Sequence, residues 1–308
     1  MPPVFLVGPT AVGKSAVALN LARRLGAEIV SADSMQVYRG MDIGTAKVKG
    51  QHLVDVCDIT DPFDVRKFIA LAQSRISTLK SVIICGGTGL YVRALRQGLF
   101  EGPGRNEELR ARLEAMPAEE LFAELEHFDP KAAATIDRHN PRRLVRALEV
   151  FHGTGKSIRD WQAEWSVGQP SRLSTRTVPS TATDRRDACP TGFCLNRERE
   201  DLYRRIEQRI DAQIAAGWLE EVRQLMAQGL EQNKTAMQAA GYRELVAHLH
   251  GELALPEAVA LIKARTRQLA RRQLTWFRRE PDLIWIDVRR DELPDETAGR
   301  ILQHFEDV

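Results

Sequence analysis

The sequence predicts an α/β protein in which a parallel β-sheet carries helices on both faces and a helical domain is inserted into the chain. Three observations lead to this prediction. Short apolar runs alternate with helical patterns over residues 1–100, a glycine-rich loop follows the first of these runs, and the pattern turns helical from about residue 105. A chain of 308 residues has room for one large or two modest domains.

The first predicted strand, residues 4–7, leads into a glycine-rich loop that opens a helix running to Leu25. The loop matches the pattern G-x-x-x-x-G-K-[ST] with Gly8, Pro9, Thr10, Ala11, Val12, Gly13, Lys14 and Ser15. Its backbone N–H groups, the helix N-terminus and the lysine ammonium can together bind an anion, while the serine hydroxyl can bind Mg²⁺. The loop predicts a P-loop NTPase-like core with a phosphorylated ligand, either a nucleoside triphosphate or another diphosphate.

Two further predicted strands end in polar or glycine-rich turns. Residues 28–31 lead into Asp33, and residues 81–85 lead into the glycines around Thr88, with a helix over 65–79 between the two strands. Because parallel strands end at one edge of the sheet, these turns should lie beside the phosphate loop. We therefore predict the active site at this edge.

The insertion should span residues 105–195, with the catalytic core formed by 1–104 and 196–308. Short helices are predicted over 107–113, 118–125 and 142–150, and the Ser-, Thr-, Pro- and Arg-rich stretch 168–193 is predicted to be flexible. Helical spacing returns from Arg199, with an i, i+4 ladder at Leu202, Ile206, Ile210 and Ile214. A basic helix over 258–279 and a last strand over 283–287 complete the prediction.

The composition is that of an ordinary globular protein, with 43% apolar and 28% charged residues. No apolar run approaches the roughly 18 residues of a membrane span, no leader sequence is visible, and the four cysteines lack the spacing of a metal site. We expect a cytoplasmic protein without a membrane or an obligate protein partner. The net charge is only +2, yet residues 263–279 carry seven Lys/Arg and no acid, which favours a polyanionic ligand.

Asp33 is the acid that we expect closest to the phosphate loop. It could hold Mg²⁺ in an NTPase or accept a proton from a bound acceptor. A hydrolytic NTPase usually needs a second acid at the end of a buried strand, and the 81–85 strand ends without one, although Asp287 is a possible substitute. The protein-kinase motifs are absent.

Nine segments resemble, in the same order, the motifs of tRNA dimethylallyltransferases, the bacterial type of the tRNA isopentenyltransferase family. They are residues 8–15, 31–38, 41–47, 52–55, 86–91, 140–150, 202–211, 241–244 and 266–273. The resemblance implies a P-loop core with a helical insertion that contacts tRNA. It also implies a prenyltransferase that moves a dimethylallyl group from dimethylallyl diphosphate to the exocyclic amine of the adenosine 3′-adjacent to the anticodon, releasing pyrophosphate.

Under this resemblance the catalytic residues are Asp33, Lys14, Thr10 and Arg209. An adenine amine is a poor nucleophile, so catalysis should depend mainly on stabilising the departing diphosphate. The loop, Lys14 and a Mg²⁺ ion held by Ser15 or Thr10 would bind the diphosphate, Arg209 would add a cation, and Asp33 would accept the proton. The loop motif is usually associated with ATP, but the missing second acid favours pyrophosphate here.

The resemblance and the basic segments together predict a surface for the tRNA anticodon stem-loop, whose target base must leave its stack. The residues assigned to tRNA are Asp33, Ser34, Met35, Gln36, Thr88, Arg110, Arg142, Arg143, Leu144, Val145, Arg146, Gln238, Gly241, Tyr242 and Arg243. On the basic helix, Arg265, Arg272 and Arg279 recur every seven residues and should form one stripe.

Three other functions remain open at this point. The chain could be a P-loop kinase or NTPase, an adenylate isopentenyltransferase that uses free nucleotide, or an RNA-binding protein without activity. The insertion and the arginine clusters favour RNA over a free nucleotide, and the intact phosphate loop beside Asp33 favours an enzyme.

Overall fold

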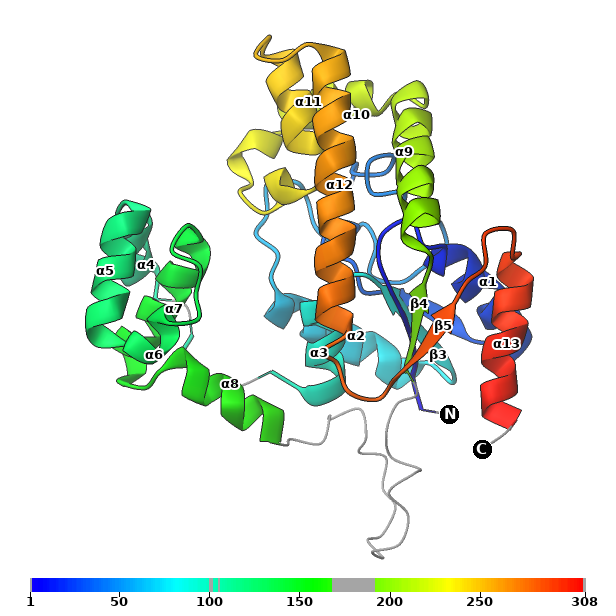
Figure 1. The fold of residues 1–308 in the computed structure, drawn as a ribbon, viewed down its shortest axis with the longest axis horizontal. Helices are drawn as coiled ribbons and strands as arrows, with labels where there is room; N and C mark the ends of the chain where they lie inside the picture. The colour runs from blue at the N-terminus through cyan, green and yellow to red at the C-terminus, as the bar shows by residue number, and fades with distance from the viewer. Residues whose placement is uncertain (1, 100–101, 105, 168–191, 307–308) are drawn as a thin grey trace, which may run out of the picture. The chain divides into compact units, whose positions relative to one another are not determined.

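The computed structural model describes residues 2–99, 102–104, 106–167 and 192–306. The chain divides into two compact units, one formed by Met1–Arg96 with Leu173–Val308 and the other by Gln97–Arg172. The first is the sheet-containing core, and the second is the helical unit. Figure 1 shows both units as ribbons.

The core is built on a parallel five-stranded sheet with the order β2-β3-β1-β4-β5. The strands are β1 (Val4–Val7), β2 (Glu28–Ser31), β3 (Val82–Gly86), β4 (Gly192–Asn196) and β5 (Leu283–Asp287). The first three strands are almost wholly buried, as expected for a parallel sheet covered on both faces. This α/β architecture confirms the predicted fold class.

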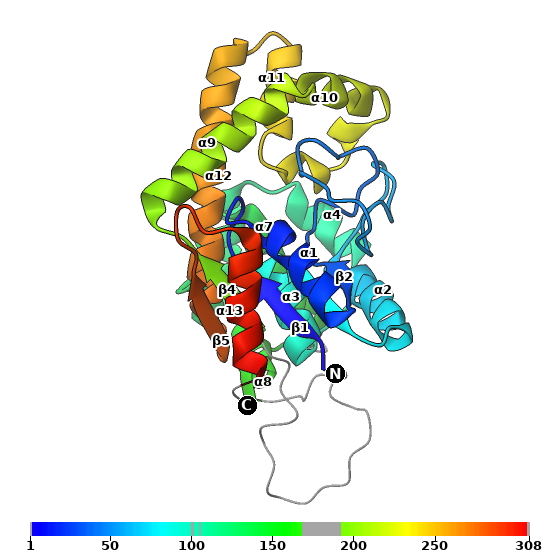
Figure 2. The same ribbon diagram turned by 90° about the vertical axis from the view of Figure 1, so that its right-hand side faces the viewer.

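Helices cover both faces of the sheet. Helix α1 (Lys14–Leu25) packs against α13 (Pro294–Glu306), and the two lie in front of the sheet in Figure 2. Helices α2 (Val65–Thr78) and α3 (Gly89–Gln97) belong to the connections that follow β2 and β3. Those connections run back across the sheet, and right-handed crossovers therefore place them on the face opposite α1.

Strand β4 is an element that the sequence pattern does not predict. Its first two residues, Gly192 and Phe193, fall in the stretch predicted to be flexible, and Cys194 and Leu195 fall in the predicted insertion. The structure instead pairs this strand with both β1 and β5. A five-residue buried strand has no alternation to reveal it, and the stretch before it is strongly polar. The rest of the predicted flexible stretch, residues 168–191, lies outside the described residues.

The chain segment between β4 and β5 forms a layer of helices beside the edge of the sheet. It contains α9 (Arg199–Ala215), α10 (Trp218–Ala227), the short 3₁₀ helices η2 (Leu230–Gln232) and η3 (Ala236–Gln238), α11 (Tyr242–Leu249) and α12 (Leu255–Phe277). In α9 the predicted ladder buries Leu202, Ile206 and Ile210. Figure 1 shows α12 as one long helix that descends to the sheet. This layer therefore places side chains of α9 and α12 above the phosphate loop.

The helical unit is described by itself. It contains α4 (Glu107–Glu114), α5 (Ala118–Phe128), α6 (Pro130–Ala133), α7 (Pro141–Thr154) and α8 (Ile158–Val167). Side chains of Asn106, Asp129 and Asn140 cap the N-termini of α4, α6 and α7. Apolar residues of α4, α5 and α7 form a separate core. Among the helices that the structure describes, none combines the length and apolarity that a membrane span requires.

Candidate active site

The phosphate loop begins where β1 ends, and its glycines are required by the backbone. Gly8 has a φ of 145°, and a Cβ there would lie 2.6 Å from the carbonyl oxygen of Leu195 on β4. Gly13 has a φ of 112° where α1 begins. Ala11 also has a positive φ, of 63°, which a residue with a side chain rarely adopts. The loop is therefore held in a particular conformation by its surroundings.

Cationic side chains donate hydrogen bonds to carbonyl groups of this loop. Three such hydrogen bonds are donated by Lys14 Nζ to Pro9 O (2.7 Å), by Arg205 Nε to Ala11 O (3.0 Å) and by Arg197 Nε to Val12 O (3.0 Å). Arg209 adds a hydrogen bond of 3.3 Å to the hydroxyl of Thr10. These contacts supply the outside restraint that the positive φ of Ala11 requires.

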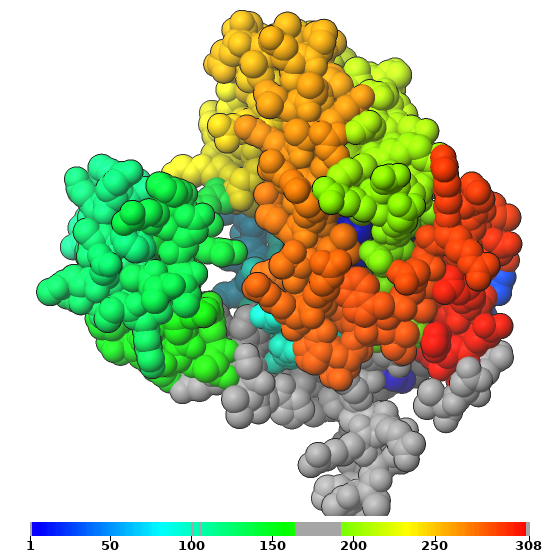
Figure 3. All heavy atoms as spheres, in the orientation of Figure 1, coloured from blue at the N-terminus to red at the C-terminus, as the bar shows by residue number. Residues whose placement is uncertain are grey.

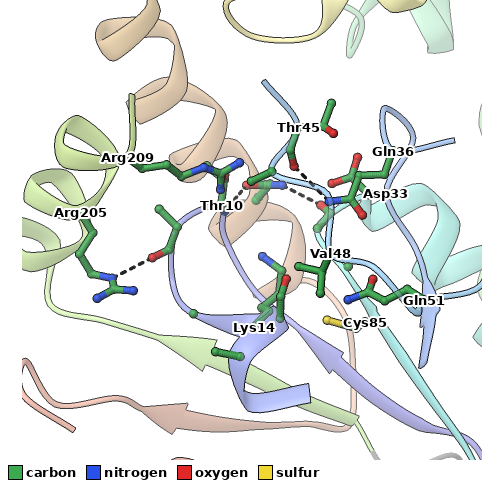
Figure 4. A pocket seen from close by; sticks show the side chains of 18 of the residues that line it. Thr10, Lys14, Asp33, Gln36, Thr45, Val48, Gln51, Cys85, Arg205 and Arg209 are labelled. Carbon is green, nitrogen blue, oxygen red and sulfur yellow. Dashed lines mark hydrogen bonds between the residues drawn. The ribbon is translucent and has the colours of Figure 1, made fainter. Parts of the chain in front are cut away.

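A cavity of about 430 Å³ opens on the loop (Figure 4). Its charged lining residues are three cations, Lys14, Arg205 and Arg209, and one acid, Asp33. None of the three cations forms an ion pair with a carboxylate within the part of the chain that the structure describes. Burial lowers the pKa of Lys14 and of Arg209, and the nearby Asp33 partly opposes both changes. Such partly buried cations, with no carboxylate in ion-pair contact among the described residues, are suited to an anionic ligand.

Asp33 is held at the end of β2 by contacts that also reach the end of β3. Its Oδ1 accepts a hydrogen bond from the Met35 amide at 2.9 Å. The Ser34 amide donates to the Thr88 hydroxyl at 3.0 Å, and the Thr88 amide donates to the Ala32 carbonyl at 3.2 Å. The acid and the turn after β3 are therefore tied into one local unit.

A smaller cavity of about 100 Å³ shares Thr10, Asp33 and Arg209 with the larger one. Much of its remaining lining is apolar and includes Met35, Ile206, Ile210, Trp218, Ala239 and Leu269. A cation-rich compartment and a compartment with an apolar wall thus meet at Asp33 and Arg209. This arrangement can accept a ligand with an anionic group at one end and an apolar group at the other.

Comparison with known proteins identifies the family of this chain. A family model described as IPP transferase matches residues 36–280, and one described as isopentenyl transferase matches residues 3–57. The chain belongs to the IPP transferase family. A protein named tRNA dimethylallyltransferase from Geobacter metallireducens is 44% identical over 300 residues, with 92% of each chain covered. One from Trichlorobacter lovleyi, named tRNA dimethylallyltransferase 1, is 43% identical over 298 residues, again with 92% of each chain covered.

Solved structures agree with this family assignment. The full-length tRNA isopentenylpyrophosphate transferase from Bacillus halodurans has a TM-score of 0.68 and 34% identity, covering 99% of this chain and 97% of its own. A eukaryotic dimethylallyltransferase acting on tRNA has a TM-score of 0.77 and 22% identity, covering 100% of this chain and 79% of its own, and it supports the fold. The resemblance stated from the sequence motifs is confirmed.

Several residues predicted from those motifs meet at the main cavity of this IPP transferase. Thr10, Lys14, Ser15, Asp33, Gln36 and Arg209 all line it. The Gln36 amide is bonded at both ends, because its oxygen accepts from the Ser31 hydroxyl (2.8 Å) and its nitrogen donates to the Thr45 carbonyl (3.1 Å). The structure therefore places Gln36 in the cavity wall with both ends of its amide bonded to the protein.

The structure buries three of the side chains that were predicted to contact tRNA. Leu144 and Val145 lie in the core of the helical unit. Tyr242 lies in the main core, and its hydroxyl donates to Glu221 at 2.6 Å. A sequence motif marks a segment but not which face of its helix is exposed. Packing also explains why residue 241 is a glycine, since a Cβ there would lie 2.1 Å from the Trp218 ring.

Some side chains of the predicted tRNA-binding set pair with buried carboxylates, and others are exposed. In the helical unit, Arg110 and Arg146 both pair with the buried Glu149, at 3.1 and 2.7 Å. In the core, Arg265 pairs with the buried Glu244. The exposed members of the predicted set are Arg142, Arg143, Gln238, Arg243, Arg272 and Arg279. Figure 3 shows α12, which carries Arg272 and ends two residues before Arg279, as a continuous strip of exposed surface on the core.

The cavity also contains residues that the sequence patterns did not single out. Arg205 lies one helical turn before Arg209, and this i, i+4 spacing could have revealed it. Gln51 is buried, and its Nε2 has no hydrogen-bond partner among the described residues. Burial raises the pKa of the Cys85 thiol to about 11, so it is protonated at neutral pH and is a poor nucleophile.

The oxygen donors at the cavity fit a magnesium ion that also takes phosphate ligands. The hydroxyls of Ser15 and Thr10 and the carboxylate of Asp33 line the same cavity. Within the described ranges, no group of three or more His, Cys, Asp or Glu side chains is placed to hold a metal. Mg²⁺ commonly combines few protein oxygens with substrate phosphates and water, so this donor set suits it.

Proposed function

We propose that this protein transfers a dimethylallyl group from dimethylallyl diphosphate to the exocyclic amine of the adenosine 3′-adjacent to the anticodon of tRNA, releasing pyrophosphate. The observation that carries the proposal is the meeting of two compartments at Asp33: one lined by cations that form no ion pair among the described residues, the other with an apolar wall. Family membership supports the same activity, since the relatives described above are named for it.

The cationic compartment would bind the diphosphate and stabilise it as it departs. Lys14, Arg205 and Arg209 surround the space in front of the loop, and each is partly or fully withdrawn from water. Negative charge grows on the leaving pyrophosphate as the carbon–oxygen bond breaks. Preorganised cations stabilise that developing charge more strongly than mobile water does.

Asp33 would serve the acceptor side of the reaction. As the adenine nitrogen bonds to the allylic carbon, the carbon–oxygen bond breaks and the electron pair leaves with pyrophosphate. The amine proton then passes to the Asp33 carboxylate, which balances the step. The hydrogen bond from Met35 orients this carboxylate, and the apolar walls at Ile206, Ile210 and Trp218 suit a five-carbon group and exclude water.

Magnesium would assist at the phosphate side. Ser15 and Thr10 are the residues that we propose to hold it, because their hydroxyls line the cavity beside Lys14. A bound Mg²⁺ ion supplies positive charge to the phosphate oxygens.

The exposed arginines would bind the RNA backbone around the anticodon. Arg142 and Arg143 lie at the start of α7. Arg243 is exposed on α11, Arg272 on α12, and Arg279 just after α12. Contacts of this kind neutralise phosphates and make affinity salt-dependent. We expect the target adenine to leave its stack in order to reach Asp33.

The test supplies dimethylallyl diphosphate, Mg²⁺ and unmodified tRNA, and follows the added five-carbon mass on one adenosine by mass spectrometry of digested RNA. Two parallel reactions separate the alternatives. Modification of free AMP but not of tRNA would indicate an adenylate isopentenyltransferase. Sustained ATP hydrolysis or phosphoryl transfer without any prenyl donor would indicate a P-loop kinase or NTPase and would contradict the proposal.

A further inference from the structure

One side chain of α12, Gln273, contacts two loops at the sheet edge at the same time. Its Oε1 accepts a hydrogen bond of 2.8 Å from the backbone N–H of Thr10 in the phosphate loop. Its Nε2 donates a hydrogen bond of 2.9 Å to the carbonyl oxygen of Gly87 in the turn after β3. Gln273 also lines both cavities.

The turn after β3 is shaped closely to this helix. A Cβ on Gly87 would lie 2.4 Å from Gln273 Nε2, and a Cβ on Gly89 would lie 2.2 Å from the ring of Trp276 on the same helix. Neither glycine has a positive φ, so a side chain at these positions would conflict with residues of α12 and not with the backbone conformation; at position 87 it would displace the Gln273 amide. Gln273 can bridge the two loops only because position 87 is a glycine.

The two loops that Gln273 joins carry opposite halves of the reaction. The phosphate loop holds the diphosphate side through Lys14 and its neighbours. The turn after β3 continues into Thr88, whose hydroxyl accepts from the Ser34 amide next to Asp33. A shift of Gly87 relative to Thr10 would therefore change the separation between the diphosphate site and the acceptor-side acid.

We propose that Gln273 is a positioning residue that sets the spacing between the phosphate loop and the Asp33 unit during prenyl transfer. This inference rests on the function proposed above and extends it to α12. The bridge needs one acceptor and one donor on the same side chain, and a glutamine amide has both. An ionised glutamate would keep the bond from Thr10 but repel the Gly87 carbonyl, and leucine would make neither bond.

The first experiment measures the rate of a single transfer step with saturating dimethylallyl diphosphate and tRNA for Gln273→Leu and Gln273→Glu. We expect the rate to fall roughly 10- to 100-fold, because small displacements of reacting groups have effects of that size. Pyrophosphate affinity should change less than about 5-fold, the equivalent of about one hydrogen bond. Gln303→Leu, an exposed glutamine on α13, is the matched control and should leave both values unchanged.

Gly87→Ala tests the bridge from its other side. The added methyl group must displace the amide of Gln273, so this variant should lose transfer rate while keeping pyrophosphate affinity. In a Gln273→Ala background the methyl group meets no amide, and Gly87→Ala should then have little further effect. Such strong non-additivity is the signature of two residues that act through one contact.

The outcomes separate this inference from the function on which it rests. If the unaltered protein transfers no dimethylallyl group, the proposed function fails. If it does, and Gln273→Leu transfers at the same rate, only the positioning role is overturned. Additive effects of Gly87→Ala and Gln273→Ala, or a loss confined to pyrophosphate affinity, would overturn it equally.

Discussion

Arginines lie around the phosphate loop of the core and around helix α7 of the helical unit. The two groups of arginines differ in the partners that balance their charge. Around the loop, Arg205 and Arg209 bond to a backbone carbonyl and a threonine hydroxyl, and neither meets a carboxylate within the described residues. In the helical unit, Arg110 and Arg146 share the buried carboxylate of Glu149. The first set of cations makes no ion-pair contact with a carboxylate among the described residues, while the second set shares one buried carboxylate within the fold.

This difference indicates which cations serve a ligand. A buried charge without a partner destabilises a fold, so it persists where a ligand supplies the missing charge. The buried carboxylate of Glu149 is fully paired by its two arginines, which gives that cluster a structural explanation. The comparison therefore supports the proposal that the loop cations bind an anionic ligand, and it indicates that the pair around Glu149 stabilises the helical unit.

The largest expected effect concerns the acid that lies among the loop cations. Asp33→Asn keeps an acceptor for the Met35 amide but cannot take the amine proton. Single-turnover transfer should slow by roughly 10²- to 10⁴-fold. Pyrophosphate binding, measured by calorimetry, should be equal or tighter because the cavity loses a negative charge. Transfer at the rate of the unaltered protein would remove Asp33 from the mechanism.

Removing a loop cation should weaken function while stabilising the ligand-free fold. Lys14→Met deletes a buried charge, so we expect a higher melting temperature without ligand and a transfer rate lower by roughly 10²- to 10³-fold. Pyrophosphate should raise the melting temperature of the unaltered protein but hardly that of the variant. Lys80→Met, at an exposed lysine, is the control. A variant that melts lower and still gains stability from pyrophosphate would contradict the comparison.

Glu149→Gln should lower stability and leave pyrophosphate binding unchanged, which is the opposite of what we expect for Lys14→Met. It leaves Arg110 and Arg146, which are 22% and 28% exposed, without their counter-ion. We expect the helical unit to lose about 1–3 kcal/mol of stability, toward the lower end because water reaches both arginines. Hydrogen exchange of α4 and α7 measures this loss locally. Pyrophosphate affinity should stay constant, and a change in it as large as the loss of stability would break the distinction between the two regions.

Much of the core could be predicted because its signals are contiguous in the chain. The strand, loop and helix from Val4 to Leu25 form one local pattern, and Asp33 ends the next buried strand. Contacts between distant segments leave no such pattern. Gln273 reaches Thr10 across 263 positions, and β4 is recognisable only from its pairing with β1 and β5. Likewise, the motif around Tyr242 gave its place in the chain, while packing decided that its side chain is buried.

The smallest effect is a pH dependence that distinguishes Lys14 from surface lysines. Burial lowers its pKa below the ordinary value of 10.5, so the unfolded chain binds this proton more tightly than the folded one. The penalty for the buried charge is fully present below the folded pKa and fades as the pH rises through that value toward 10.5. The stability advantage of Lys14→Met, measured by denaturant unfolding without ligand, should therefore shrink in alkaline solution. If the difference in unfolding free energy between the variant and the unaltered protein stays constant across that range, the charge of Lys14 is not the source of the destabilisation.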